Sequence, residues 1–243
     1  MDWQDHMMEN VKNWLLGSGI REELDRNFLL PFGNPYLFQK ELFFQQFSDI
    51  EKIGLFYKAK YQDMNISFTE PVFGAPMVSM YTEILHQMGV RNIIGCGYVG
   101  GLTDKQEIGS YVIPSAGYGF DGTSRSYSPH RVSYPASDTL YQSIKSVLSE
   151  RNVKYESGPI VSIDALMLEN DKMISDFIKQ GFYCVDLETA CLYGLGNILG
   201  INVAAVHIVT DNPYQKNIDE EMFHEASMVE QIHICLESFK LIV

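Results

Sequence analysis

The chain has 243 residues, a length that fits one α/β domain with a sizeable hydrophobic core. Its formal net charge of −13 argues against binding along a nucleic-acid backbone, which needs many Lys and Arg side chains, although one local site could still hold a small anion. No apolar run approaches the ~20 residues of a membrane span. We therefore expect a small-molecule partner, with neither nucleic acid nor membrane.

The cysteines lie in apolar runs and lack metal-ligand spacing. We expect buried free thiols in a reducing compartment, with no bound metal and no cofactor. The first five residues are largely polar and contain no apolar signal core, which predicts a cytoplasmic protein. The four cysteines are Cys96, Cys184, Cys191 and Cys235.

The first part of the chain begins with an amphipathic helix, predicted at residues 2–16. Trp3, Met7, Val11 and Leu15 share one helical face, and Gly17 is a suitable stop. We interpret residues 1–27 as an added N-terminal helical segment that packs on the domain or on a neighbouring subunit. The elements predicted next are a strand running into a turn at 28–35, an aromatic-rich helix at 36–47, and strands at 53–56 and 65–68.

The middle of the chain alternates helices and strands. Gly74-Ala75-Pro76 begins a helix through Met88, because proline is tolerated in a first helical turn. A buried strand at 92–96 opens into a glycine-rich turn at 97–102, which could present backbone amides to an anion or could simply allow a tight turn. The elements predicted next are a strand at 110–114, a polar loop at 117–129, a helix at 139–148, a strand at 157–163 and a helix at 171–180.

The stretch from residue 182 to residue 211 predicts a strand at 182–185, an Ala/Leu-rich helix at 187–199 and a strand at 203–209. Ligands of open α/β sheets bind beyond the carboxyl ends of strands, so Glu188 and Asp211 should lie together there. Both acids could instead stabilise helix N-termini. A final helix is predicted at 220–241. The alternation predicts a single α/β domain over residues 1–243, with helices on both sides of a mixed central sheet in three layers.

Four motifs in register carry a family resemblance: Gly74-Ala75-Pro76, Gly97-x-x-Gly100-Gly101-Leu102, Val185 to Ala190, and Val209-Thr210-Asp211. With them the chain resembles the nucleoside phosphorylase family, which holds hexameric purine nucleoside phosphorylases, uridine phosphorylases and methylthioadenosine/adenosylhomocysteine nucleosidases. The resemblance covers roughly residues 28 to 241, in a register similar to that of the bacterial purine enzymes. It implies a phosphorylase/hydrolase-like fold and an enzyme that breaks N-glycosidic bonds.

The resemblance also implies roles for individual residues. Glu188 would accept hydrogen bonds from ribose hydroxyls, Leu187 would form an apolar platform under the sugar, and Phe73 falls near ribose and phosphate. Asp211 would be the general acid that protonates the leaving base, with a pKa raised by burial. His224 aligns with an arginine that approaches this aspartate in the purine enzymes, and a solvated surface histidine is the alternative.

The base site and the phosphate site depart from the family pattern. Leu166 and Met167 replace an aromatic pair that stacks on the base, and Val185 and Asp186 are assigned to the same base site. The purine enzymes hold phosphate with two arginines and a serine. Here these three positions are occupied by Leu37, Gly95 and Tyr98. Two further residues are assigned to this former phosphate site. Gly33 lies in the first loop, and Lys52 aligns near a third arginine, which a neighbouring subunit supplies in the family.

Phosphate is consequently a doubtful partner, because two charge-assisted contacts are lost at about 1.5–3 kcal/mol per charged hydrogen bond. The loss of these contacts favours hydrolysis of a nucleoside as the function. The alternatives are phosphorolysis with an anion site built differently and nucleoside binding without catalysis. A homo-oligomer, from dimer to hexamer, is expected from the family. The candidates for a rebuilt anion site are Lys52, Arg125 and Arg131, and those for a water-activating glutamate are Glu22, Glu23 and Glu41.

Overall fold

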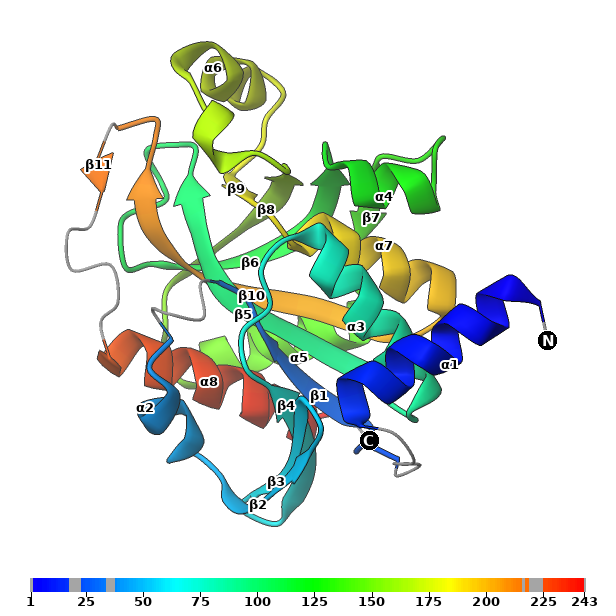
Figure 1. The fold of residues 1–243 in the computed structure, drawn as a ribbon. Helices are drawn as coiled ribbons and strands as arrows, with labels where there is room; N and C mark the ends of the chain where they lie inside the picture. Colours follow the sequence, from blue (N-terminus) through cyan, green and yellow to red (C-terminus); the bar gives the residue numbers. More distant parts are fainter. Residues whose placement is uncertain (1, 18–22, 34–37, 216, 219–224, 243) are drawn as a thin grey trace.

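The computed structural model describes residues 2–17, 23–33, 38–215, 217–218 and 225–242. In this part of the chain eleven strands form one mixed sheet (Figure 1). The strands are β1 Asn27–Pro31, β2 Ser48–Ile53, β3 Phe56–Tyr61, β4 Met64–Thr69, β5 Asn92–Gly101, β6 Tyr111–Gly119, β7 Ser133–Pro135, β8 Tyr155–Ser162, β9 Cys184–Asp186, β10 Asn202–Asn212 and β11 Asn217–Ile218.

Helices lie on both sides of this sheet, and one short 3-10 turn, η1, precedes α6. Their bounds are α1 Trp3–Leu16, α2 Lys40–Phe44, α3 Ala75–Gln87, α4 Gly122–Tyr127, α5 Asp138–Glu150, η1 Leu166–Leu168, α6 Asp171–Lys179, α7 Thr189–Leu199 and α8 Glu225–Lys240. The predicted α/β class with a mixed central sheet is confirmed. None of the helices in the described ranges is long and apolar enough to cross a membrane.

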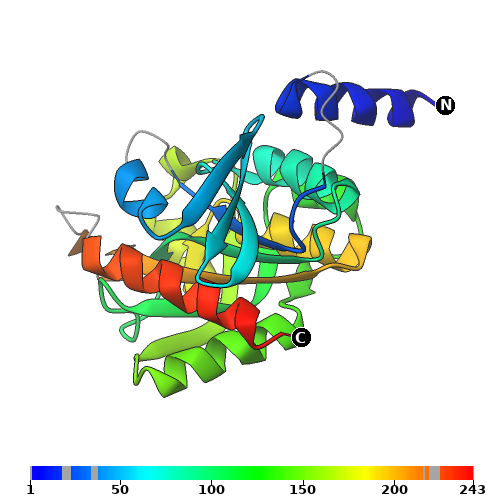
Figure 2. The ribbon, with the colours of Figure 1, turned by 90° about the horizontal axis from the view of Figure 1, so that it is seen from below.

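The sheet has two apolar faces because neighbouring strand residues point to opposite sides. In β10, Val203 and Ala205 pack with α3 and α7, whereas Ala204 and Val206 pack with α5 and α8. Figure 2 shows α5 and α8 on one side of the sheet and α3 on the other. All four cysteines are buried and free, as predicted.

Five strands of the sheet close on themselves. β10 pairs with both β5 and β6, and the path β6–β8–β9–β5 completes the ring. β10 runs parallel to β5, while β9 runs antiparallel to it. The sequence interpretation assumed that the carboxyl ends of β9 and β10 share one edge of an open sheet. They do not, because the two strands run in opposite directions.

Two predicted elements are wrong for a common reason, the placement of glycines. The predicted strand at 53–56 is instead a tight turn between β2 and β3, in which Gly54 has a φ of 64° that only glycine adopts easily. The predicted turn at 97–102 is instead the end of β5. There the glycines permit close packing, since a Cβ on Gly97 would lie 2.8 Å from Phe32 Cβ.

Other segments differ in extent. Within the described residues, the predicted helix at 36–47 is reduced to the five residues of α2. The predicted loop at 117–129 instead completes β6 and contains α4, whose Asp121 side chain accepts a hydrogen bond from Ser124 N at 2.6 Å. The start of the predicted helix at 220–241 lies outside the described residues, and α8 is seen from Glu225.

Candidate active site

The second half of β5 lies between two predicted site residues. Gly100 is the register partner of Val185 on β9 and of Asp211 on β10. A Cβ on Gly100 would lie 3.0 Å from Asp211 Oδ2 and 3.1 Å from Val185 Cγ1. The absence of a side chain on Gly100 thus lets the Asp211 carboxylate sit over β5, beside Val185.

Asp211 is mostly withdrawn from solvent. Burial raises the pKa of its carboxyl group, and the hydrogen bond that Thr210 Oγ1 donates at 3.1 Å opposes this rise in pKa only in part. Glu169 follows η1, and burial together with the negative charge of Asp211 raises the pKa of Glu169 to about 7. The sequence interpretation missed Glu169, and its position two residues after Met167 was the only available signal.

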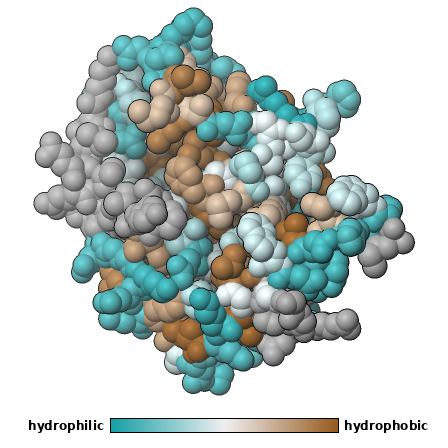
Figure 3. Space-filling model, in the orientation of Figure 1, coloured by the Kyte–Doolittle hydropathy of each residue, from teal (hydrophilic) through white to brown (hydrophobic). Residues whose placement is uncertain are grey.

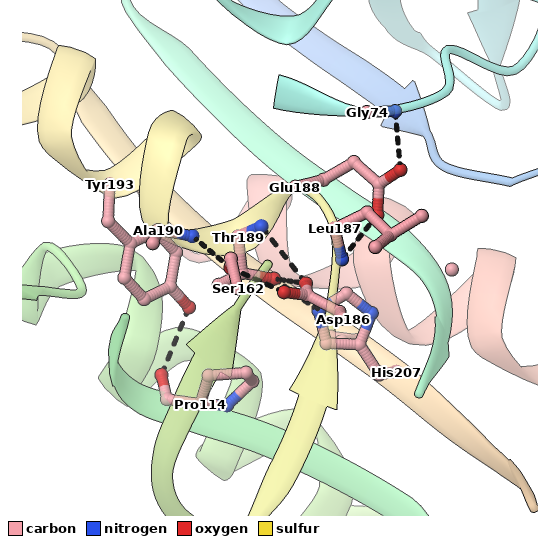
Figure 4. Close-up of polar contacts among 12 residues, drawn as sticks. Gly74, Pro114, Ser162, Asp186, Leu187, Glu188, Thr189, Ala190, Tyr193 and His207 are labelled. Atoms are coloured by element: carbon pink, nitrogen blue, oxygen red, sulfur yellow. Dashed lines mark hydrogen bonds and ion pairs between the residues drawn. The ribbon is translucent and has the colours of Figure 1, made fainter. Parts of the chain in front are cut away.

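Glu188 is buried and held by backbone amides from two segments (Figure 4). Gly74 N donates to Oε1 at 2.7 Å, and Leu187 N donates to Oε2 at 3.2 Å. Burial, followed by the charge of Asp186, raises the pKa of Glu188. Because Phe73 precedes Gly74, the structure brings together the predicted ribose residues Phe73, Leu187 and Glu188.

Asp186 is also buried, but its carboxylate is engaged inside the protein. Thr189 N donates to it at 2.9 Å, and the hydroxyl groups of Thr189 and Ser162 donate as well (Figure 4). His207 Nε2 lies 2.8 Å from Thr189 Oγ1, and burial lowers the pKa of His207 to about 3, so the ring is neutral. Asp186 therefore fixes the start of α7, and these bonds leave it little capacity for a base.

The region predicted as a former phosphate site contains aromatic rings. A Cβ on Gly95 would lie 2.5 Å from Phe32 Cε2, and a Cβ on Gly33 would lie 3.7 Å from Tyr98 Cδ2. Burial raises the pKa of Tyr98, so its hydroxyl stays protonated. A cavity of about 20 Å³ lies beside Tyr98, and none of the described residues lining it is lysine or arginine. Those residues are Pro31, Phe32, Phe38, Phe43, Cys96, Gly97, Tyr98, Met228, Gln231 and Ile232.

The predicted base-stacking residues lie at the surface of the chain. Leu166 and Met167 belong to η1, and Met167 is 93% exposed. In Figure 3, apolar surface gathers beneath α6, the region from which the chain enters that helix in Figure 1. The 164–170 loop is fixed at its start, where Gly122 N donates to Asp164 Oδ2 at 2.7 Å, and at its end, where Asn170 caps α6. Glu169 is thereby held in place next to the exposed apolar residues.

The remaining candidates are dispersed. Lys52 is exposed on β2, with its ammonium group 5.7 Å from the centre of the Tyr57 ring. Arg125 packs on Phe120, while Arg131 donates to Asn197 Oδ1 at 2.8 Å. Glu23 and Glu41 are exposed. Leu37, His224 and Glu22 lie outside the described residues. In the described ranges no group of three or more His, Cys, Asp or Glu side chains is arranged to hold a metal ion.

Several known proteins are similar to this chain. The family model of the phosphorylase superfamily matches residues 35–240. A guanosine phosphorylase from Halorubrum lacusprofundi is 26% identical over 69% of this chain and 72% of its own length. A DeoD-type purine nucleoside phosphorylase from Buchnera aphidicola is 26% identical over 86% of this chain and 90% of its own. A uridine phosphorylase from Thermococcus kodakarensis is 26% identical over 71% of this chain and 67% of its own length.

The fold is shared with a solved structure of uridine phosphorylase from Vibrio fischeri. It superposes with a TM-score of 0.78 over 90% of this chain and 92% of that one, at 20% identity. The architecture is thus the α/β fold of nucleoside phosphorylases. The chain belongs to the phosphorylase superfamily, and the predicted resemblance is confirmed.

Proposed function

We propose that this enzyme cleaves the N-glycosidic bond of a nucleoside with water, not phosphate, as the nucleophile. The observation that carries the proposal is the aromatic filling of the former phosphate site. The ring of Phe32 occupies the space beside Gly95, and Tyr98 lies against Gly33. A phosphate dianion needs charged or multiple polar donors to replace its hydration. One tyrosine hydroxyl is too little.

The acids support the cleavage step. As the bond breaks, the ribose becomes cation-like and the base leaves with negative charge unless it is protonated. Burial raises the pKa of Asp211, which favours the protonated form needed for a general acid. Glu188 presents a carboxylate oriented by Gly74 N and Leu187 N, which suits two adjacent ribose hydroxyls.

Phosphorolysis is the second candidate, favoured by the relatives. All three named above are phosphorylases, for guanosine, purine nucleosides or uridine. In this case a neighbouring chain would have to bring a cation to the site, and the exposed Lys52 on the β2–β3 hairpin is suited to that. Either function fits a homo-oligomer that completes the site with residues of an adjacent chain.

The test is product identity. The protein is incubated with guanosine, adenosine, inosine and uridine, with and without inorganic phosphate, and base and sugar products are separated. Hydrolysis predicts free ribose at a rate that does not depend on phosphate. Ribose 1-phosphate formed in proportion to added phosphate would replace this proposal with phosphorolysis.

A further inference from the structure

Helix α1 lies outside the segment that matches the family model, which begins at residue 35. Its inner face is anchored, since Leu15 is buried and Met8 and Val11 pack against the same core cluster. Leu55 N also donates to Leu15 O at 2.9 Å. The Asp2 and Asp5 side chains form a capping box at its start. The helix is therefore a fixed part of the surface with its outer side uncovered.

The outer side of α1 carries a stripe of large side chains. Trp3 and Trp14 are each 74% exposed and Met7 is 42% exposed. With Asn10 they follow the spacing 4-3-4, which places all four on one face of a helix. These are the only two tryptophans of the chain. Exposed tryptophans gathered on one face are typical of an interface, where they contribute most to binding.

The stripe is suited to contact a copy of itself. Its spacing reads the same from either end, so two antiparallel α1 helices place Trp3 against the partner's Trp14 and Met7 against the partner's Asn10. The acids Asp2, Asp5 and Glu9 lie on another side of the helix. In a chain with a net charge of −13, an uncharged face avoids the like-charge repulsion that two copies would otherwise experience.

The surface next to the stripe is hollowed rather than flat. A groove of about 260 Å³ runs between α1, α3 and Tyr127, lined mainly by Met7, Met8, Val11 and Met80. It also contains Glu83, whose carboxylate accepts a hydrogen bond from the Tyr127 hydroxyl. Figure 2 shows α1 at the edge of the molecule, with its outer side facing away from the rest of the chain. A bulky side chain of a second copy thus has a place to pack.

We propose that the outer face of α1 is a docking surface for a second copy of this chain, with the two α1 helices antiparallel about a twofold axis. A single pair of helices buries less than the ~800 Å² per partner of a standard interface. Association through α1 is accordingly weak and depends on protein concentration. It is distinct from any contact within residues 35–240.

Intrinsic tryptophan emission tests the proposal directly, since both tryptophans lie on the stripe. The full chain is diluted in series while emission and mass, by analytical ultracentrifugation, are recorded. We expect the emission maximum to move to longer wavelength as mass falls. Mass that changes without a shift in emission would place association elsewhere and overturn the proposal. Emission typical of exposed tryptophan at every concentration would overturn it too.

Two variants and one matched control define the face. Trp3→Glu and Trp14→Lys should each abolish the shift of the remaining tryptophan, and both suit the helix dipole at their positions. Glu9→Ala, on the charged side of the same helix, should associate like the parent chain.

The relative orientation of the two helices is tested by cross-linking introduced cysteines, because the native cysteines are buried. A Met7→Cys chain should cross-link to an Asn10→Cys chain, and cross-linking of Met7→Cys chains to each other instead would overturn the antiparallel arrangement. A shift caused by zwitterionic lipid vesicles in the dilute protein would assign the face to a membrane surface.

Discussion

The ring of Phe32 lies where a side chain at Gly95 would have to go. A Cβ on Gly95 would be 2.5 Å from Phe32 Cε2 and 2.7 Å from Phe32 Cζ, and Phe32 stacks on the buried His207 ring at a centroid distance of 6.1 Å. According to the family resemblance, the purine enzymes have a phosphate-binding arginine at the position of Gly95. The Phe32 ring fills the space that this side chain would need. Gly95 is required for the packing of Phe32.

This relationship predicts that Gly95→Ala destabilises the fold by about 1–3 kcal/mol, the usual effect of overpacking a core. The ring of Phe32 cannot shift freely because it also stacks on the buried ring of His207. Chemical denaturation of Gly95→Ala, Phe32→Ala and the double variant measures the effect. The double variant should lose less stability than the sum of the two single variants, and strict additivity would show that the two positions are independent.

Asp211→Asn tests the general acid. We expect base release to fall about 10²-fold or more, since the group that protonates the leaving base is removed. The fold should persist, because the only hydrogen bond described for the Asp211 side chain comes from Thr210. Steady-state kinetics with the best substrate of the panel measures the rate. A variant that keeps full turnover would remove Asp211 from the mechanism.

Glu188→Gln tests ribose recognition. The amide oxygen of glutamine can still accept from Gly74 N, but its NH2 group then faces Leu187 N, so the melting temperature should fall modestly, while the charge-assisted hydrogen bonds to ribose are lost. At about 1.5–3 kcal/mol per charged hydrogen bond, kcat/KM should fall about 10- to 100-fold. The comparison of ribonucleosides with 2′-deoxynucleosides is the control, because the variant should discriminate between them less than the parent enzyme.

Glu169 predicts a pH dependence of stability. The pKa of Glu169 is raised from 4.5 to about 7 in the folded chain, so folding favours the protonated carboxyl group. The contribution of Glu169 to the free energy of unfolding is therefore fully present below pH 4.5 and is lost as the pH rises through 7. Glu169→Gln removes this loss. Because the group is partly solvated, we expect a gain of only about 1 kcal/mol at pH 8, or roughly 2–4 °C in Tm. Thermal scans at pH 5 and pH 8 measure it, and an equal difference at both pH values contradicts the assignment.

Asp186→Ala tests the network under α7. The change leaves the buried hydroxyls of Ser162 and Thr189 and the amide of Thr189 without their acceptor. The cost should be about 3 kcal/mol or more, at about 1–3 kcal/mol per unsatisfied buried group. Denaturation measures it, and Ser149→Ala on the exposed side of α5 is the control. A loss below 1 kcal/mol would mean that the network is dispensable.

Residue order alone was enough to identify the family and to select candidate site residues. Apolar runs such as Val203–Val209 identified buried strands, and Glu188 and Asp211 stood out because acids follow such runs. Four motifs in register led to the superfamily that the comparison confirms. These features are local, since they depend on residue type and on spacing within a short stretch.

How those residues come together depends on the three-dimensional fold. Val185 and Asp211 lie together because β9 and β10 flank β5 from opposite sides, in opposite directions, over the bare Gly100. The effect of the Asp211 charge on the pKa of Glu169 and the filling of the Gly95 position by Phe32 also join segments far apart in the chain. Pattern in the sequence could not reveal them, because such contacts depend on strand register and on the space that side chains leave, both of which are set only when the sheet closes.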